Sequence, residues 1–334
     1  SQIILSGDYW LIPKETMVDY YKEEWTVRDA LVTNIKESIR LDGVISNDPE
    51  SVLRFDVDNF QLDHINQFVP NRVLDLKGVT DIHGKARNVL GILSLEAGMT
   101  IDNLALGKEI IGDLDLNSTW DRGQNYLSFT GGITDGVRRE IQLDGKFYPD
   151  ITGGILDAEL TLDRFDLNIL NKIPTSAISD LGGHASGTLS VVGSVFEPEV
   201  TGTLMFDKTK VKVNYLNTRY TFSSEVIIEK DWMGFDYIPF TDEYGNSGNI
   251  NGTIIHDRFR SWNYDFFAEF ENMFCLNTSI TENNIFYGRV MASGSISLSG
   301  YGEDVDIEVH AKTEKGSNIE LPLGSREEVV FEDY

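Results

Sequence analysis

The residue types that most often carry chemistry are scattered along this sequence rather than grouped. None of the five histidines stands in an H-x-x-x-H or an H-x-E motif; they are His64, His83, His184, His256 and His310. A metal site needs three or four convergent ligands, so the sequence predicts no metal. The one cysteine, Cys275, lies on an alternating apolar and polar segment without a nearby base, which favours a buried thiol over a nucleophile.

Acidic runs are the next candidates, because the chain holds 54 Asp and Glu residues against 28 Lys and Arg. The carboxylates of Asp56, Asp58 and Asp63, or of Asp113 and Asp115, could ligate calcium, but neither run has the D-x-D-x-D-G spacing of a calcium loop. Solvated strand faces explain these runs better. No pair of carboxylates stands out as a glycosidase site, and no phosphate-binding G-x-x-x-x-G-K is present. The sequence therefore predicts neither an enzyme nor a cofactor.

Charge, cysteine content and hydropathy exclude several classes of partner and structure. A formal net charge of −26 argues against nucleic acid, whose phosphates it would repel. A single cysteine excludes an intramolecular disulfide, and no run of about 18 apolar residues predicts a transmembrane helix. No signal peptide opens the chain, so we interpret it as a segment of a longer protein.

The elements that must position these residues have a period of two. Leu53, Phe55 and Val57 alternate with charged residues, as does the run from Leu156 to Leu162, which is typical of half-buried strands. Apparent turn signals recur between such runs, at Asp42-Gly43, Tyr244-Gly245-Asn246, Asn251-Gly252 and Glu314-Lys315-Gly316. Helical signal is confined to residues 16–24 and to a short stretch from residue 167, so the chain is predicted to be all-β.

An internal repeat organises the strands. The segments 39–43, 141–145 and 249–252 share one pattern, and 105 residues separate both Phe60 from Phe165 and Asp75 from Asp180. Such a repeat is too long for a solenoid coil of about 20–50 residues. We predict one continuous segment over residues 1–334, with repeats at approximately 26–130, 131–235 and 236–334. Tandem sandwich domains are the alternative, but no Pro- or Ser-rich linker separates the copies.

Glycine-punctuated motifs carry a family resemblance. The run GTLSVVGS from Gly187 is followed by Pro198 and by VTGTL from Val200, and related patterns occur at 211–220, 276–278, 287–288 and 319–324. In their order and spacing, from about Thr26 onward, these motifs resemble the TamB/AsmA-like family, in the version found in Bacteroidetes-type bacteria. The first 25 or so residues match no motif of that family.

The resemblance implies a long curved sheet, the β-taco, with a hydrophobic trough along it. It also implies a periplasmic protein with an inner-membrane anchor upstream and an outer-membrane barrel of the TamA class as partner. Its implied function is to shield phospholipid acyl chains in transit between the inner and outer membranes. An alternative function within the family is assembly of outer-membrane β-barrel proteins through strand addition at an exposed edge.

Physical reasoning from the residues leads to the same trough. An open sheet with one apolar and one acidic face must keep the apolar face dry, and a lengthwise fold would do so. The alternatives are a closed core, in which these side chains pack against one another, and a carbohydrate-binding or adhesive β protein that uses exposed tryptophans. The residues predicted to line the trough are Leu53, Phe55, Val57, Leu160, Leu162, Leu189, Val191, Val211, Val213, Ile250, Ile254, Phe266 and Phe270.

Overall fold

The computed structural model describes residues 2–5, 8–65, 76–107, 109–121, 123–134, 136, 139–149, 154–172, 178–194, 197–257, 260–301 and 304–322. Within these ranges the chain forms 21 strands and two 3₁₀ turns, η1 and η3, and no α-helix. The strands belong to one open, curved, antiparallel sheet, which confirms the predicted all-β class. No helix in the described part of the chain has the length and apolar character needed to cross a membrane.

The chain divides into two compact units. Unit 1 holds residues 1–172, 185–204 and 227–230, and unit 2 holds residues 173–184, 205–226 and 231–334. The first elements are β1 (Gln2–Leu5), β2 (Asp8–Leu11), β3 (Met17–Tyr21), β4 (Glu24–Thr33), β5 (Ser38–Ile45), β6 (Val52–Gln61), η1 (Leu62–Ile65), β7 (Leu76–Arg87), β8 (Ser94–Leu106), β9 (Glu109–Asp121), β10 (Tyr126–Thr134), β11 (Arg139–Tyr148), β12 (Ile155–Asp166) and η3 (Leu167–Lys172). The later ones are β13 (Ile178–Ser194), β14 (Glu197–Val213), β15 (Thr218–Ile228), β16 (Trp232–Asp242), β17 (Ser247–Asp257), β18 (Arg260–Thr278), β19 (Tyr287–Tyr301), β20 (Asp304–Thr313) and β21 (Asn318–Glu320).

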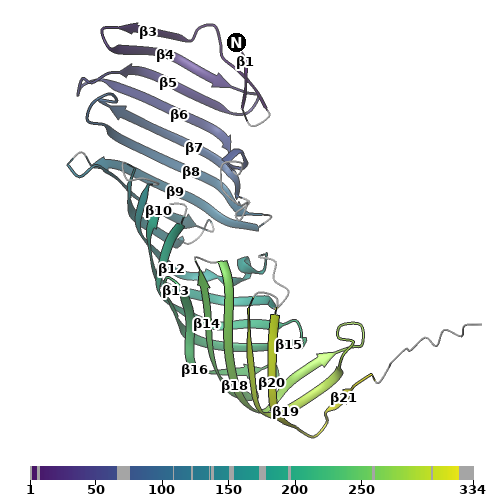
Figure 1. Ribbon diagram of the computed structural model, residues 1–334. Coiled ribbons are helices and arrows are strands. Elements are labelled where there is room, and N and C mark those ends of the chain that lie inside the picture. Colours follow the sequence, from purple (N-terminus) through teal and green to yellow (C-terminus); the bar gives the residue numbers. More distant parts are fainter. Residues whose placement is uncertain are drawn as a thin grey trace, which may run out of the picture. The chain divides into compact units, whose positions relative to one another are not determined.

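Strand pairing in unit 1 follows chain order. Each strand from β3 to β11 pairs antiparallel with the next, ending with β12, and β4 to β9 lie side by side (Figure 1). The β1–β2 hairpin joins β4 through the pairing of Leu11 with Thr33. Neighbouring strands in sequence are thus neighbours in space, which is the arrangement that short connections favour.

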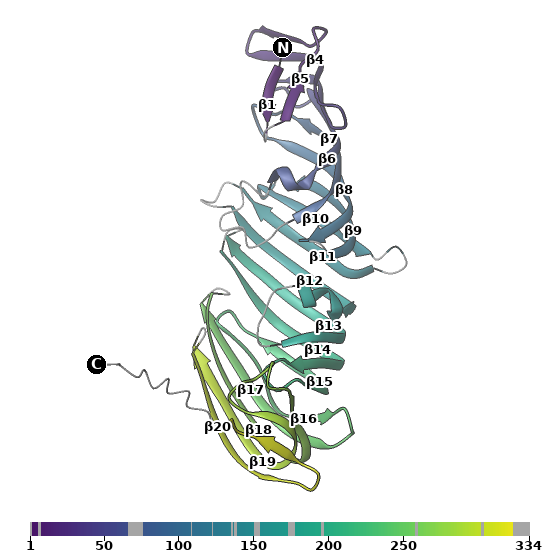
Figure 2. The same ribbon diagram turned by 90° about the vertical axis from the view of Figure 1, so that its right-hand side faces the viewer.

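In unit 2, β16 to β20 also pair in chain order, and β21 pairs with β19 beyond the end of β20. The strands β17 to β20 bend along their length (Figure 2).

Bulges with a common design interrupt the strand pairs. In five of them, on β4, β6, β8, β16 and β18, a residue with positive φ sits where the register shifts. Its backbone N–H donates to a side-chain oxygen on the following strand. Bulges of this kind bend a strand and increase its twist, so they account for curvature of the sheet. The donor–acceptor pairs are Asp29–Asp42, Asn59–Asp81, Asn103–Asp113, Tyr237–Asn251 and Asn272–Ser293, at 2.6 to 3.3 Å.

This design corrects two of the expected turns. Asp42-Gly43 and Asn251-Gly252 lie inside β5 and β17, where the Asp and Asn side chains accept the bulge N–H groups. The turns expected at Tyr244-Gly245-Asn246 and at Glu314-Lys315-Gly316 do connect strands. The sequence pattern was correct in marking special backbone sites, but these sites occur within strands as well as between them.

The predicted helix over residues 16–24 is wrong. Residues 17–21 form β3, a turn at Lys22 and Glu23 follows with positive φ at both residues, and β4 begins at Glu24. Met17 to Tyr21 pair residue by residue with Arg28 to Glu24, so the hairpin overrides the local helical spacing. The short helical stretch expected from residue 167 is present as the 3₁₀ turn η3.

Candidate functional site

The register of unit 1 aligns an apolar face across eight strands. Directly paired residues form a row from β5 to β12 that consists of Leu41, Phe55, Gly84, Ala97, Ser118, Phe129, Gly145 and Ala158. A second row, two residues along each strand, consists of Ile39, Val57, Ile82, Met99, Leu116, Gly131, Leu143 and Leu160. Seven strand spacings of about 4.8 Å make each row about 34 Å long. We call this surface the apolar face of unit 1.

The intervening row points to the opposite side of the sheet and is polar. It consists of Arg40, Asp56, His83, Gly98, Asn117, Thr130, Asp144 and Glu159. A hollow of about 520 Å³ lies on this polar face around Gly98. On its lining His83 lies 2.9 Å from Asp56, Lys85 pairs with Glu96 at 2.7 Å, and Arg54 stands beside them. With a neutral His83, the charges of Arg54 and Lys85 balance those of Asp56 and Glu96, so the hollow presents no net charge that would select an ionic ligand.

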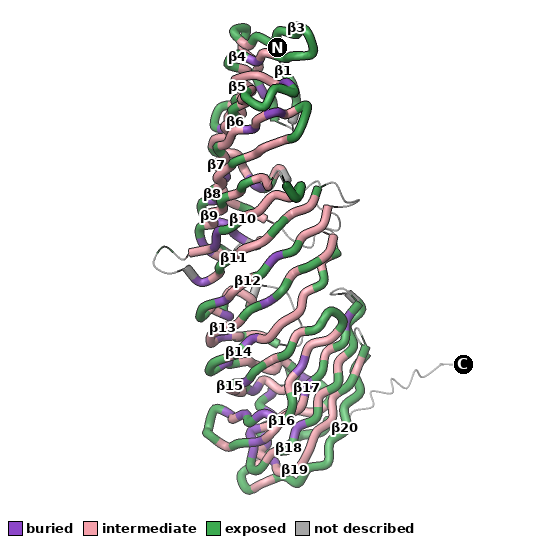
Figure 3. The backbone as a smooth tube through the Cα atoms, turned by 90° about the vertical axis from the view of Figure 1, so that its left-hand side faces the viewer, coloured by how far each residue is buried: buried purple, intermediate pink, exposed green. Residues whose placement is uncertain are grey.

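The apolar face of unit 1 is only partly covered. Gly131 of the second row is buried, but all seven of the row's apolar side chains are half-buried, whereas in a closed sandwich such positions would be fully buried. The tube in Figure 3 accordingly shows long runs of intermediate exposure with short buried patches. One end is covered from within the chain, because Leu62 of η1 packs on Ile101 and Leu104 and is 7% exposed.

Aromatic rings lean across glycines on the apolar faces. Phe55 is paired with Gly84, and a Cβ placed on Gly84 would lie 2.8 Å from Cε2 of the ring and closer still to Cζ. Phe129 and Gly145 repeat this arrangement, with Cζ of the ring 2.6 Å from such a Cβ. No positive φ requires glycine at these positions, so the glycines provide space for the rings. The rings therefore lie low on the sheet.

Unit 2 carries a corresponding apolar face on β16 to β20. One row consists of Ile238, Ile250, Ala268, Ile296 and Val309, and the adjacent row consists of Phe235, Gly252, Phe266, Leu298 and Ile307. Gly252 accommodates rings from both sides, because a Cβ there would lie 2.5 Å from Phe266 Cδ1 and 2.8 Å from Phe235 Cζ. Phe206, Phe222, Phe235 and Phe266 form a ladder with ring centroids 6.2 to 6.4 Å apart.

Nine of the thirteen predicted trough residues lie on these two faces. The strand pairings put Leu53, Phe55, Val57, Leu160 and Leu162 on the apolar face of unit 1, and Ile250, Ile254, Phe266 and Phe270 on that of unit 2. Leu189 on β13 packs beside Gly202, and Val191 on the same strand is half-buried, as are Val211 and Val213 on β14. Sequence reasoning missed Phe129, Phe235 and Phe240, although each stands two residues from another apolar or glycine position.

Two side chains of unit 2 that could be reactive, Cys275 and His256, lie in apolar or aromatic surroundings. Burial raises the pKa of the Cys275 thiol to about 12, and its Sγ donates to the Met273 carbonyl oxygen at 3.3 Å. The thiol is half-buried between two apolar clusters rather than fully buried as expected. Burial also lowers the pKa of His256, which stacks on Trp262 with centroids 5.2 Å apart. The arrangement favours packing roles for both side chains.

Comparison with known proteins identifies no relative. No family model, no curated protein and no solved structure matches the chain. The function must therefore be argued from the two faces themselves.

Proposed function

We propose that this chain is a segment of a TamB/AsmA-like periplasmic protein that shields phospholipid acyl chains between the inner and outer membranes. The observation that carries the proposal is the partly uncovered apolar face of unit 1, which runs across eight strands with a charged face behind it. At about 34 Å it exceeds the depth of one leaflet, which is half of the roughly 30 Å hydrocarbon core. An acyl chain therefore fits along it.

The energetic argument concerns the barrier to moving a lipid through water. Exposing acyl chains costs about 0.8 kcal/mol per methylene, or about 25 kcal/mol for two chains of ordinary length. A half-buried side chain such as Val57 or Leu160 would lose its remaining contact with water when an acyl chain covers it. Both surfaces gain from the contact, and the polar headgroup stays in solvent. No bond is made or broken, so the function needs no catalytic residue.

Site-specific photocrosslinking tests the proposal. A benzoylphenylalanine placed at position 160 would face the apolar side, and one at position 159 would face the polar side, one residue away on the same strand. With vesicles of phosphatidylethanolamine and phosphatidylglycerol labelled in their acyl chains, we expect lipid adducts at 160 and few at 159. Phe55→Arg, Val57→Arg and Leu143→Arg together should abolish the adduct at 160 while the β content remains. Equal adducts at the two positions, or adducts that survive the three arginines, would refute it.

A second candidate function has one observation in its favour. All residues of β20 are exposed, and within the described part of the chain its one paired neighbour is β19. Val305, Ile307 and Val309 alternate there with acidic residues, so the free side offers a template for strand addition. This would suit an assembly factor for outer-membrane β-barrels acting with a TamA-like barrel. Crosslinks from β20 to an unfolded barrel protein, without lipid adducts at 160, would favour this function over lipid shielding.

A further inference from the structure

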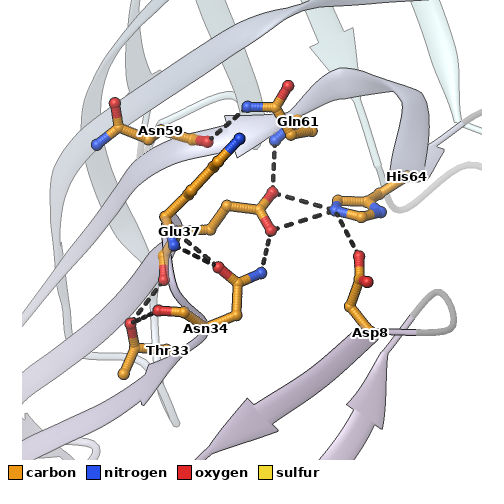
Figure 4. Close-up of polar contacts among 8 residues, drawn as sticks. Asp8, Thr33, Asn34, Glu37, Asn59, Gln61 and His64 are labelled. Atoms are coloured by element: carbon orange, nitrogen blue, oxygen red, sulfur yellow. Dashed lines mark hydrogen bonds and ion pairs between the residues drawn. The ribbon is translucent and has the colours of Figure 1, made fainter.

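Three side chains with metal-ligating atoms converge in unit 1, from three separate elements. Asp8 begins β2, Glu37 lies in the turn between β4 and β5, and His64 belongs to η1 (Figure 4). His64 Nε2 lies 3.0 and 3.3 Å from the two carboxylate oxygens of Glu37 and 4.0 Å from Asp8 Oδ2. One atom from each residue lies within 4.8 Å of the other two. Two carboxylates thus face a single imidazole nitrogen.

The Glu37 carboxylate is held in place by its own loop. The side chain is buried, with the residue 3% exposed, and its Oε1 accepts the backbone N–H of Gln61 at 2.7 Å. The side-chain amide of Asn34 donates to Oε2, while Asn34 Oδ1 accepts the N–H groups of Lys36 and Glu37, both at 2.8 Å. These bonds fix the carboxylate toward His64, which is the kind of outer support that metal ligands usually have.

Unit 2 contains a useful internal comparison. Buried Asp242 accepts the N–H of Phe274, two residues after the bulge residue Asn272, just as Glu37 accepts the N–H of Gln61, two residues after the bulge residue Asn59. The Asp242 cap is completed by N–H groups of its own turn. Among the described residues, only the Glu37 cap is joined by a histidine and a second carboxylate. Capping the strand therefore does not explain His64 and Asp8.

Hydrogen bonding to His64 accounts for Glu37 but not for Asp8, which lies at ion-pair distance. Nε2 carries at most one proton, and Glu37 already lies at hydrogen-bonding distance from it. Asp8 Oδ2, at 4.0 Å, lies beyond a hydrogen bond. In a tetrahedral zinc site with bonds of about 2.0–2.2 Å, neighbouring ligand atoms are about 3.3–3.6 Å apart, and the observed separations bracket that range. Nitrogen with carboxylate oxygen is a donor set that suits divalent transition metals such as Zn²⁺.

We propose that Asp8, Glu37 and His64 form a binding site for one divalent transition-metal ion of the Zn²⁺ type. The ion takes the lone pair of His64 Nε2 and an oxygen from each carboxylate, and water completes the coordination. The Asp8 side chain is 61% exposed, so the ion enters from that side. Bound there, it links the β1–β2 hairpin to η1 and to the β4–β5 turn. The site has no part in lipid shielding and stands independently of that function.

Zinc titration of the full chain, without a histidine tag and after chelator treatment, tests the site. Calorimetry should give one Zn²⁺ per chain, and Co²⁺ should give the visible absorption of a low-symmetry nitrogen and oxygen site. Loss of an outer-shell partner typically costs 10–100-fold in affinity, so His64→Gln and Asp8→Asn, which remove ligands, should each weaken binding by roughly 100-fold or more. Asp8 is mostly exposed, so its variant keeps the fold if the His64 variant does not.

The matched control is His83→Gln. His83 forms a pair with one carboxylate, Asp56, at 2.9 Å on the polar face of the same unit, and no described residue supplies a third ligand there. Its replacement should leave the affinity and stoichiometry unchanged. Absence of Zn²⁺ binding to the unaltered chain would overturn the proposal, and so would unchanged binding in Asp8→Asn or an equal loss in His83→Gln.

Discussion

The glycines beneath the aromatic rings give the sharpest test of how the apolar face is built. Gly84 on β7 lies under the Phe55 ring, whereas Gly98 on the adjacent strand β8 lies on the polar face. Neither residue has a positive φ that would itself require glycine. We therefore expect Gly84→Ala to destabilise unit 1 and Gly98→Ala to leave it unchanged or slightly more stable.

The magnitudes follow from the space at each position. At Gly84 the new Cβ would lie 2.8 Å from both Phe55 Cε2 and the Glu96 carbonyl oxygen, and the latter belongs to the backbone. Phe55 Cζ would lie closer still, so restoring ordinary contact requires the ring to retreat by about 1 Å, and overpacking of this kind costs about 1–3 kcal/mol. Replacing glycine by alanine also stabilises the fold by about 0.4–1 kcal/mol, because it reduces the conformational entropy of the unfolded chain. The free energy of unfolding is therefore expected to fall by up to about 2.6 kcal/mol, and by about 1.3 kcal/mol at the middle of these two ranges.

At Gly98 the nearest atom to such a Cβ is Asn117 Oδ1 at 3.5 Å, which is ordinary contact. Only the lower conformational entropy of the unfolded chain remains, so the free energy of unfolding of this variant rises by up to about 1 kcal/mol. Urea denaturation followed by tryptophan fluorescence measures the difference between the two variants. A third variant, Gly84→Ala with Phe55→Leu, should recover part of the loss because the shorter side chain frees the space. Equal stability of the two single variants would refute the account of rings lying low over glycine.

Two further predictions concern polar groups. Burial alone would raise the pKa of Asp242, but hydrogen bonds from Asn246, Phe274 and Tyr244 outweigh it and hold this pKa below its usual value. Asp242→Asn should lower the free energy of unfolding by about 2 kcal/mol above pH ~4. This difference from the wild type should shrink in acid, because the wild-type carboxyl becomes protonated there. Urea denaturation at a series of pH values measures the difference, and a difference independent of pH would contradict this prediction. Asp81→Ala removes the acceptor of the Asn59 N–H, 2.6 Å away. It should lower the free energy of unfolding by about 1 kcal/mol and speed amide exchange at the β6 bulge. The control is Asp157→Ala on β12, where the side chain is exposed, and it should change the free energy of unfolding by less than about 0.5 kcal/mol.

The fold was predictable from the sequence because the alternation of apolar and polar residues has the period of a strand. Leu53, Phe55 and Val57 do share one face, and the charged residues between them share the other. The predictions that were wrong concerned local structure. Asp42-Gly43 has the composition of a turn, but it lies opposite a bulge, where an acceptor side chain and a residue without Cβ are also needed. Composition alone cannot separate these two uses of the same dipeptide.

The polar cluster was beyond sequence reasoning for a different reason. Asp8, Glu37 and His64 are separated by 29 and 27 residues, so no short spacing connects them, and the expectation of no metal rested on short spacings. Only the pairing of β4 with β2 and with β5, and the position of η1 after β6, brings their side chains together. The glycines under the rings were equally hidden, because each ring and its glycine lie on different strands.

The low rings also bear on what covers the apolar faces. Two packed sheets lie about 10 Å apart, and projecting side chains from both fill that space by interdigitating. Phe55 and Phe129 instead lean over Gly84 and Gly145, so this part of the surface has few projections for a second sheet to lock into. A protein partner of fixed shape gains less from such a surface than a flexible hydrocarbon chain, which adapts to a shallow floor and needs no directional contacts. For this reason the low relief along the row from Phe55 to Ala158 favours acyl chains over a second protein layer as its occupant.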